Sequence, residues 1–232
     1  MITAAKDKSI NELLEINDSY QAPQKLMEIL FDETRRKKLF LEMLSQNHDV
    51  SFDWFHEYFQ AEHADRKEKK QDFTPNSISK LLSKLVGTGE GSNLDVAAGT
   101  GGITITKWQE DRMKESPFTY KPSEHYYQCE ELSDRAIPFL LFNLMIRGMN
   151  ATVLHGDTLT RSFKGVFFIQ NEKDDHMTFS SLNIVPDSEN LRELLMINEY
   201  ENVYPSHVES KAYPAHLNID SDPRQMQLFQ EA

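Results

Sequence analysis

Apolar residues recur every three or four positions along the first part of the chain, and this is the period of an α-helix. Three such stripes follow one another: Ile10, Leu13, Leu14 and Ile16, then Leu26, Ile29 and Leu30, then Leu39, Phe40, Met43 and Leu44. Their spacing predicts a helical N-terminal region over residues 1–66.

Two segments of this region each have two interpretations. The aromatic cluster at residues 52–59 is typical of a helix that packs onto a core, and the alternative is a stacking platform for nucleic-acid bases. Its acidic neighbours Asp53, Glu57 and Glu62 favour packing. The basic run at residues 66–70 is interpreted as a solvated linker, with a phosphate contact as the alternative.

Further along the chain, short apolar runs alternate with helical segments. Strands are expected at 94–98, 126–129, 152–154, 166–169 and within 177–185, and helices at 133–146 and 188–197. This alternation predicts a parallel sheet with helices on its faces. We therefore expect an α/β domain over residues 67–198, followed by a polar tail over 199–232.

Composition and charge narrow the choice of partners. The net charge of -12 makes the chain a poor electrostatic match to a polyanion, so contact with DNA needs a local basic patch or a partner protein. The single cysteine rules out an internal disulfide and, together with the absence of a long apolar run, predicts a cytoplasmic protein with no membrane span. The eight scattered histidines show no zinc-ligand spacing, and we expect no metal.

The candidate chemistry is concentrated in the glycine-rich stretch Leu94–Gly102. An acidic residue near a strand end is followed by glycines, which let the backbone approach a ligand and take positive φ. The next helix then offers free N–H groups to an anion. The alternative is an ordinary tight turn between strand and helix.

Other motifs stand before and after this stretch. Phe73, Thr74 and Pro75 precede it, Glu130 and Glu131 end the next strand, and Asp157 ends the strand after that. A carboxylate at the end of the strand that carries Glu130 and Glu131 is placed to accept hydrogen bonds from a ribose diol. The carboxylate of Asp157 could accept one from an adenine amino group.

The order of these motifs resembles that of the modification subunits of type I restriction systems and related adenine-N6 DNA methylases. The resembling sequences are Phe73–Pro75, Asp95–Gly102, Glu131–Ser133 followed by Asn143–Met149, and Gly156–Leu159, and they cover roughly residues 71–170. The resemblance implies a Rossmann-like, S-adenosylmethionine-dependent methyltransferase fold behind a helical N-terminal region. With four or five strands expected, against about seven in a complete methylase, the sheet is expected to be incomplete.

The resemblance also implies roles for individual residues. Phe73, Thr74 and Pro75 would line the methionine end of the cofactor, and Asp95, Ala97, Gly99, Thr100 and Gly101 would form the glycine-loop contact. Glu131, rather than Glu130, would hold the ribose hydroxyls, and Asp157 would meet the adenine ring.

The chain departs from the family where the chemistry is done. Active members carry Asn-Pro-Pro followed by Tyr or Phe after the fourth strand, and the aromatic ring stacks on the flipped base. This chain has no Pro-Pro pair, and after Val166–Gln170 it reads Asn171-Glu172-Lys173-Asp174. Asn171 would occupy the catalytic position, but without the prolines that fix the backbone there.

The C-terminal stretch Gln225–Phe229 resembles the short peptide with which bacterial proteins dock on the replicative sliding clamp. Gln225, Leu228 and Phe229 would make that contact, with the two apolar side chains in a pocket of the clamp. The alternative is a tail that packs back on its own domain.

Together these features predict a methylase-like protein that binds S-adenosylmethionine, is impaired in catalysis, and serves as an accessory in DNA modification, anti-restriction or DNA processing. DNA would be reached through a partner protein. Two alternatives stay open, an active methyltransferase with an atypical catalytic motif and a non-enzymatic interaction module on a methylase scaffold.

Overall fold

The computed structural model describes residues 9–58, 78–79, 82, 91–116 and 118–211. The N-terminal region is helical there, as predicted. It comprises α1 (Ile10–Leu14), a short 3-10 helix (Ser19–Gln21), α2 (Ala22–Leu30) and α3 (Glu33–Gln46). Side-chain caps set two of the starts: Ser9 and Glu12 form a capping box on α1, and Asp32 accepts a hydrogen bond from Arg35 N at the start of α3.

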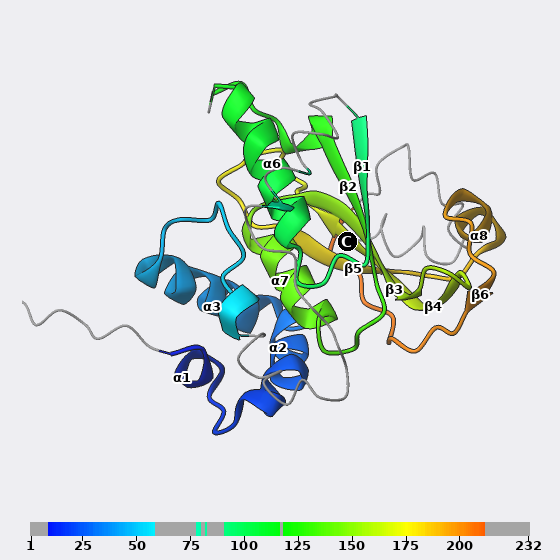
Figure 1. The fold of residues 1–232 in the computed structure, drawn as a ribbon, viewed down its shortest axis with the longest axis horizontal. Coiled ribbons are helices and arrows are strands. Elements are labelled where there is room, and N and C mark those ends of the chain that lie inside the picture. The colour runs from blue at the N-terminus through cyan, green and yellow to red at the C-terminus, as the bar shows by residue number, and fades with distance from the viewer. Residues whose placement is uncertain (1–8, 59–77, 80–81, 83–90, 117, 212–232) are drawn as a thin grey trace, which may run out of the picture.

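A six-stranded sheet forms the centre of the molecule (Figure 1). Its strands are β1 (Gly91–Val96), β2 (His125–Glu131), β3 (Asn150–Asp157), β4 (Ser162–Gln170), β5 (Ser181–Val185) and β6 (Glu199–Tyr200). The order is β1-β2-β3-β4-β5, with β6 on β4. The α/β class is thus confirmed.

The direction of the strands corrects one expectation. The strands β1, β2 and β3 are parallel, but β4 runs antiparallel to both β3 and β5. A parallel connection needs a crossover of about a dozen residues or more, whereas only residues 158–161 separate β3 from β4. The two strands therefore form a hairpin, and the last residues of β4 lie beside the first residues of β3.

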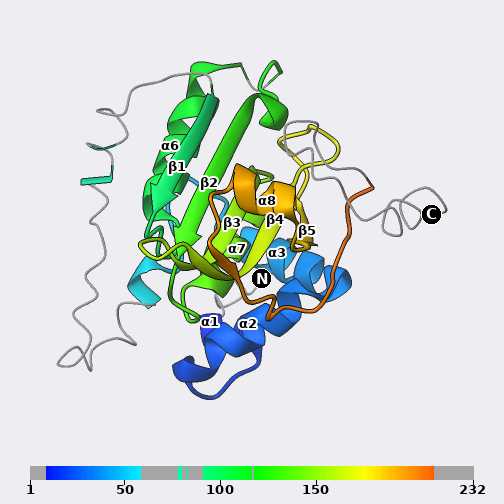
Figure 2. The ribbon, with the colours of Figure 1, turned by 90° about the vertical axis from the view of Figure 1, so that its right-hand side faces the viewer.

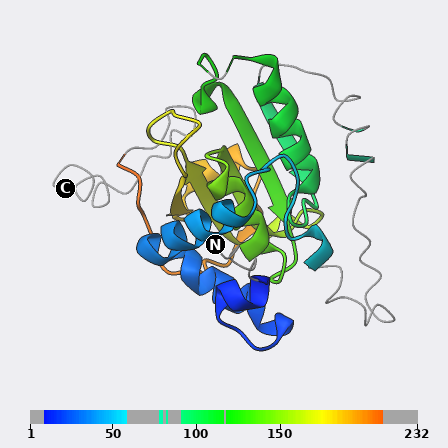
Figure 3. The ribbon, with the colours of Figure 1, turned by 90° about the vertical axis from the view of Figure 1, so that its left-hand side faces the viewer.

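Helices cover both faces of the sheet. The helices α6 (Gly102–Lys114) and α7 (Ile137–Ile146) lie on one face together with the N-terminal helices, as Figure 3 shows in green and blue. The short helix α8 (Glu189–Leu194) lies on the other face (Figure 2). All ten residues of α7 are buried, because the sheet covers one side of it and α2 the other.

The N-terminal helices and the sheet share one hydrophobic core. The Phe55 ring is 1% exposed and lies 4.8 Å from the Phe139 ring and 5.0 Å from the Phe142 ring, and Phe40 packs edge-on against Phe142. For Phe55, packing rather than base stacking is therefore the correct interpretation. The basic run at residues 66–70 lies outside the described residues.

The segment after β6 also belongs to the folded structure as far as residue 211. Ile184 N donates to His207 O at 2.7 Å, and Glu209 N and Ser210 N both donate to Asn183 Oδ1 at 2.9 Å. The polar segment expected from residue 199 onward thus begins by packing along β5. No helix among the described residues is long and apolar enough to cross a membrane.

A buried ion pair joins this C-terminal segment to the N-terminal helices. The Glu209 carboxylate accepts hydrogen bonds from both terminal nitrogens of Arg36, at 2.8 and 2.6 Å, and from Leu182 N and His207 Nε2. Burial by itself would raise the pKa of Glu209, but the bonds from His207, Arg36 and Leu182 outweigh it and lower the pKa to about 2.

This depressed pKa predicts acid sensitivity. The stabilisation by the Glu209 carboxylate should be complete above the ordinary carboxyl pKa of 4.5 and disappear as the pH falls toward 2. We expect a loss of about 2 kcal/mol across that window, after allowance for solvent screening. Urea unfolding of Glu209→Gln should show a flatter pH profile, and the exposed control Glu201→Gln should keep the wild-type profile. If the free energy of unfolding of Glu209→Gln fell with pH as steeply as that of the wild type, this prediction would be wrong.

Candidate functional site

The glycine-rich stretch forms a turn between β1 and α6, and glycine is required in it. Gly99 and Gly101 have φ of 59° and 95°, in the left-handed region. A Cβ on Gly101 would lie 2.9 Å from Leu140 Cδ1 on α7. The turn is anchored to β2, because Ala97 N and Ala98 N donate to Glu130 O at 2.8 and 3.0 Å. The start of α6 thus lies at the carboxyl ends of the parallel strands.

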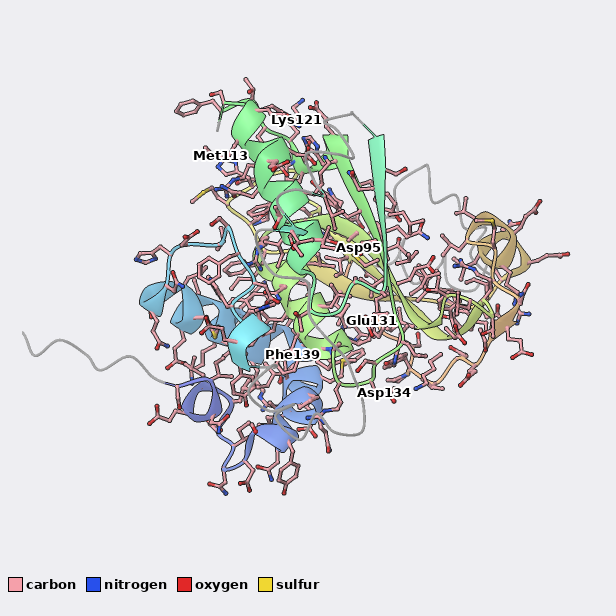
Figure 4. The ribbon with its side chains drawn as sticks, viewed as in Figure 1. Asp95, Met113, Lys121, Glu131, Asp134 and Phe139 are labelled. Atoms are coloured by element: carbon pink, nitrogen blue, oxygen red, sulfur yellow. The ribbon has the colours of Figure 1, made fainter. Side chains whose placement is uncertain are left out.

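Glu131 is bound directly to this turn. One of its carboxylate oxygens accepts from Gly99 N at 2.7 Å, and the other from Ser133 N at 2.8 Å. Figure 4 shows Glu131 near the end of β2, with Asp95 on the neighbouring strand. A carboxylate offers about four acceptor positions. Glu131 can therefore shape the turn and still accept a hydrogen bond from a ligand hydroxyl.

A cavity of about 410 Å³ opens at the carboxyl ends of β1, β2 and β3. This volume lies within the usual range of small-molecule sites, and the carboxyl edge of parallel strands is the usual place for a ligand in such folds. Its lining comes from the glycine turn and the start of α6, the end of β2, the β3–β4 turn, one residue of the N-terminal region and one residue before β1: Ala97, Ala98, Gly99, Thr100, Gly102, Ile103, Glu130, Glu131, Leu132, Gly156, Asp157, Thr158, Leu159, His56 and Ser79.

Two further carboxylates in this lining differ in the hydrogen bonds that they already accept from other parts of the protein. Glu130 is 1% exposed, and one of its oxygens accepts from both Thr158 Oγ1 at 2.7 Å and Arg161 at 2.6 Å. Asp157 accepts from the backbone N–H of Leu159 at 2.8 Å, and this bond lowers the pKa of its carboxyl. Asp157 thus offers an ionised acceptor at the cavity, whereas Glu130 neutralises Arg161 and joins β2 to the β3–β4 turn.

The structure thus brings Ala97, Gly99, Thr100, Glu131 and Asp157 together around one cavity, while Asp95 and Gly101 do not line it. The Asp95 carboxylate accepts from Thr104 Oγ1 at 2.8 Å and borders a smaller cavity of about 140 Å³ beside β1. Burial raises its pKa, and the nearby Glu131 charge adds to the shift. The Asp95 side chain is thus bonded to α6, and its place in the glycine-loop contact stays a prediction. Phe73, Thr74 and Pro75 lie outside the described residues.

Asn171, the expected catalytic residue, lies away from this cavity. Its backbone N–H donates to Asn150 Oδ1 at 2.8 Å, so it lies where β3 begins, whereas the cavity lies where β3 ends at Asp157. At about 3.3 Å per residue, these ends are roughly 20 Å apart. The Asn171 amide donates to Gly148 O and Asp175 O instead, and Thr178 Oγ1 donates to it. The antiparallel course of β4 is the physical reason.

The sequence-based interpretation missed a buried polar cluster beneath the glycine turn, formed by Asp53, Asn143 and Arg147. Burial raises the pKa of Asp53, although Thr100, Phe55 and Asn143 all donate to its carboxylate. Burial lowers the pKa of Arg147 to about 10, so its guanidinium is charged at neutral pH. The signal that could have revealed the cluster is the pair Asn143 and Arg147, four residues apart at the end of an otherwise apolar run.

Two further expectations concern the C-terminal motif and metal binding. Gln225, Leu228 and Phe229 lie outside the described residues. Within the described residues, no group of three or more His, Cys, Asp or Glu side chains is arranged to hold a metal ion.

Comparison with known proteins gave one family. A family model described as N-6 DNA methylase matches residues 47–181, which is more than half of the 232 residues. No curated protein and no solved structure matches the chain. The matched range contains the glycine turn, the lining of the cavity and the buried polar cluster.

Proposed function

The chain belongs to the N-6 DNA methylase family, and on this premise we propose that it binds S-adenosylmethionine in the cavity at the carboxyl ends of β1, β2 and β3. The observation that carries the proposal is the cavity lining itself. A glycine turn, a helix start and three carboxylates surround one space of about 410 Å³. When bound, the cofactor supplies an activated methyl group.

The groups around the cavity match the chemistry of this cofactor part by part. The N–H groups at the start of α6 suit the carboxylate of its methionine moiety, because a helix N-terminus attracts anions. Glu131 supplies acceptors for the ribose hydroxyls, and Asp157 supplies one for the adenine amino group. Leu132, Leu159 and Ile103 provide apolar contact for the adenine ring.

We further propose that methyl transfer by this chain alone is impaired. Two observations support this. The Asn-Pro-Pro-aromatic sequence is missing, and Asn171 lies beside the first residue of β3, whereas the cavity lies at the last residue of that strand. The target amino group would therefore lack the acceptors that the family places beside the methyl group. We propose that the chain serves instead as an accessory in DNA modification, anti-restriction or DNA processing.

The acidity of the chain favours access to DNA through a partner protein, since a net charge of -12 opposes direct contact with the phosphate backbone. Contact of Gln225, Leu228 and Phe229 with a sliding clamp is a second proposed partner interaction. It is supported by the sequence motif at Gln225–Phe229.

Titration calorimetry with S-adenosylmethionine tests the cofactor site. We expect micromolar binding by the wild type and a loss of about 10- to 100-fold in Glu131→Ala, the usual effect of removing a charged hydrogen-bond acceptor. The matched control Glu201→Ala removes an exposed carboxylate that is not part of the cavity lining and should bind like the wild type. Absence of binding by the wild type would overturn the proposal.

The second part is tested with labelled S-adenosylmethionine and DNA that lacks adenine methylation. Cofactor binding without incorporation of label would support impaired catalysis. Incorporation by the purified chain would refute it and favour an active enzyme with an atypical acceptor group.

A further inference from the structure

The N-terminal region reaches the glycine turn through one buried carboxylate. Asp53 is 5% exposed and comes from the segment that follows α3. One of its oxygens accepts from the Thr100 hydroxyl, and the other from Asn143 Nδ2 at 2.7 Å and Phe55 N at 2.9 Å. A residue of the helical region is therefore bonded directly to the middle of the turn.

Thr100 is held at two points. Its hydroxyl donates to Asp53, and its carbonyl accepts from Asn143 Nδ2 at 2.8 Å. Gly99 and Gly101 on either side have positive φ, and glycines of this kind give an unrestrained turn many accessible conformations. Fixing the residue between them restricts the whole turn.

Arg147 sets the orientation of the Asn143 amide. Its guanidinium donates to Asn143 Oδ1 at 2.9 Å and to Asn143 O at 2.7 Å. Because the amide oxygen faces Arg147, the amide nitrogen is directed at Asp53 and Thr100. Arg147 also donates to Val50 O at 2.8 Å and Phe52 O at 2.6 Å, which holds the segment carrying Asp53 against α7.

We propose that Asp53 is a positioning residue, which holds the glycine turn in its ligand-binding conformation from the N-terminal helical region. The inference rests on the proposed cofactor site. His56, on the same segment as Asp53, forms part of the wall of that cavity. A turn that is ordered before the ligand arrives has less conformational entropy to lose on binding. Residues of the N-terminal helical region thereby contribute to affinity.

The test compares Asp53→Ala with Asp53→Asn in the full chain. Asparagine keeps an oxygen for Phe55 N and Asn143, and its amide can donate to Thr100, so it should restore the function of the carboxylate. Phe55→Leu is the matched control. It loosens the packing of the same segment against Phe139 and Phe142 but leaves the Asp53 bonds in place.

Three quantities are measured for each variant: the melting temperature, the affinity for S-adenosylmethionine, and amide hydrogen exchange of residues 97–103 without ligand. Asp53→Ala should weaken affinity about tenfold and raise exchange in the turn about tenfold. Asp53→Asn should stay within about threefold of the wild type. Phe55→Leu should lower the melting temperature without either change.

If Asp53→Ala resembles Phe55→Leu in affinity and exchange, Asp53 is a purely structural residue and the inference is wrong. Faster exchange in the turn without weaker binding would also overturn it. If the wild type binds no S-adenosylmethionine, the proposed function fails, and the exchange measurement still decides the inference: unchanged exchange in Asp53→Ala refutes it, and faster exchange supports Asp53 as the residue that holds the turn.

Discussion

Replacing Arg147 with methionine is expected to lower the free energy of unfolding by about 3–5 kcal/mol, the range for removing one member of a buried charged network. Arg147 is 3% exposed and donates four hydrogen bonds, which reach Val50 O, Phe52 O and both oxygens of Asn143. Methionine fills much of the same volume but donates none of these bonds. It would leave the carbonyls without donors and Asp53 without its nearby cation.

Urea unfolding measures this loss. The matched control is Arg192→Met, which breaks an exposed ion pair with Asp187 and should leave the free energy of unfolding close to that of the wild type. Arg147→Lys should recover little, because a single ammonium group cannot reproduce the geometry of the guanidinium. A cost for Arg147→Met as small as for the control would show that the cluster does not hold the N-terminal segment.

Replacing Asn171 with alanine is expected to cost about 3 kcal/mol in stability and to leave affinity for S-adenosylmethionine within about twofold of the wild type. Asn171 is 5% exposed, and its side chain bonds to Gly148 O, to Asp175 N and O, and to Thr178. Alanine would leave several of these groups without partners in a site that water enters poorly.

Asn198→Ala is the matched control, since Asn198 donates one exposed bond to Thr160 O and its loss should cost less than about 1 kcal/mol. Denaturant unfolding and calorimetry separate the two roles of Asn171. A large loss of cofactor affinity in Asn171→Ala at unchanged stability would contradict the structural role and restore a place for this residue in the ligand site.

The residues that line the cavity indicate how the proposed contact with DNA could be made. Leu159 and Leu132 line the cavity and are 93% and 61% exposed. The described lining also contains the carboxylates Glu130, Glu131 and Asp157 and no lysine or arginine. It therefore offers no basic group to a phosphate backbone, consistent with the proposed need for a partner protein to bring DNA to it.

Local pattern was sufficient for much of this protein. Apolar spacing along residues 10–44 predicted the N-terminal helices, and the short apolar runs predicted most of the strands, because each depends on which side chains share a face. The glycines of the turn were recognisable because positive φ restricts the choice of residue. The position of acidic residues at the ends of two neighbouring strands predicted that they share one end of the sheet, and Glu131 and Asp157 do line one cavity there.

The tertiary structure alone decided the rest. The apolar run at Val166–Ile169 suits a parallel or an antiparallel strand equally well, and the short connection at residues 158–161 made it antiparallel. That direction carried Asn171 away from the cavity. Asp53 and Asn143 are 90 positions apart in the chain, and no local spacing indicates that they bond. The sequence by itself determined most of the helices, strands and turns, since those depend on neighbours along the chain. Which segments meet depends on how the faces pack, and this is settled only when the whole core forms.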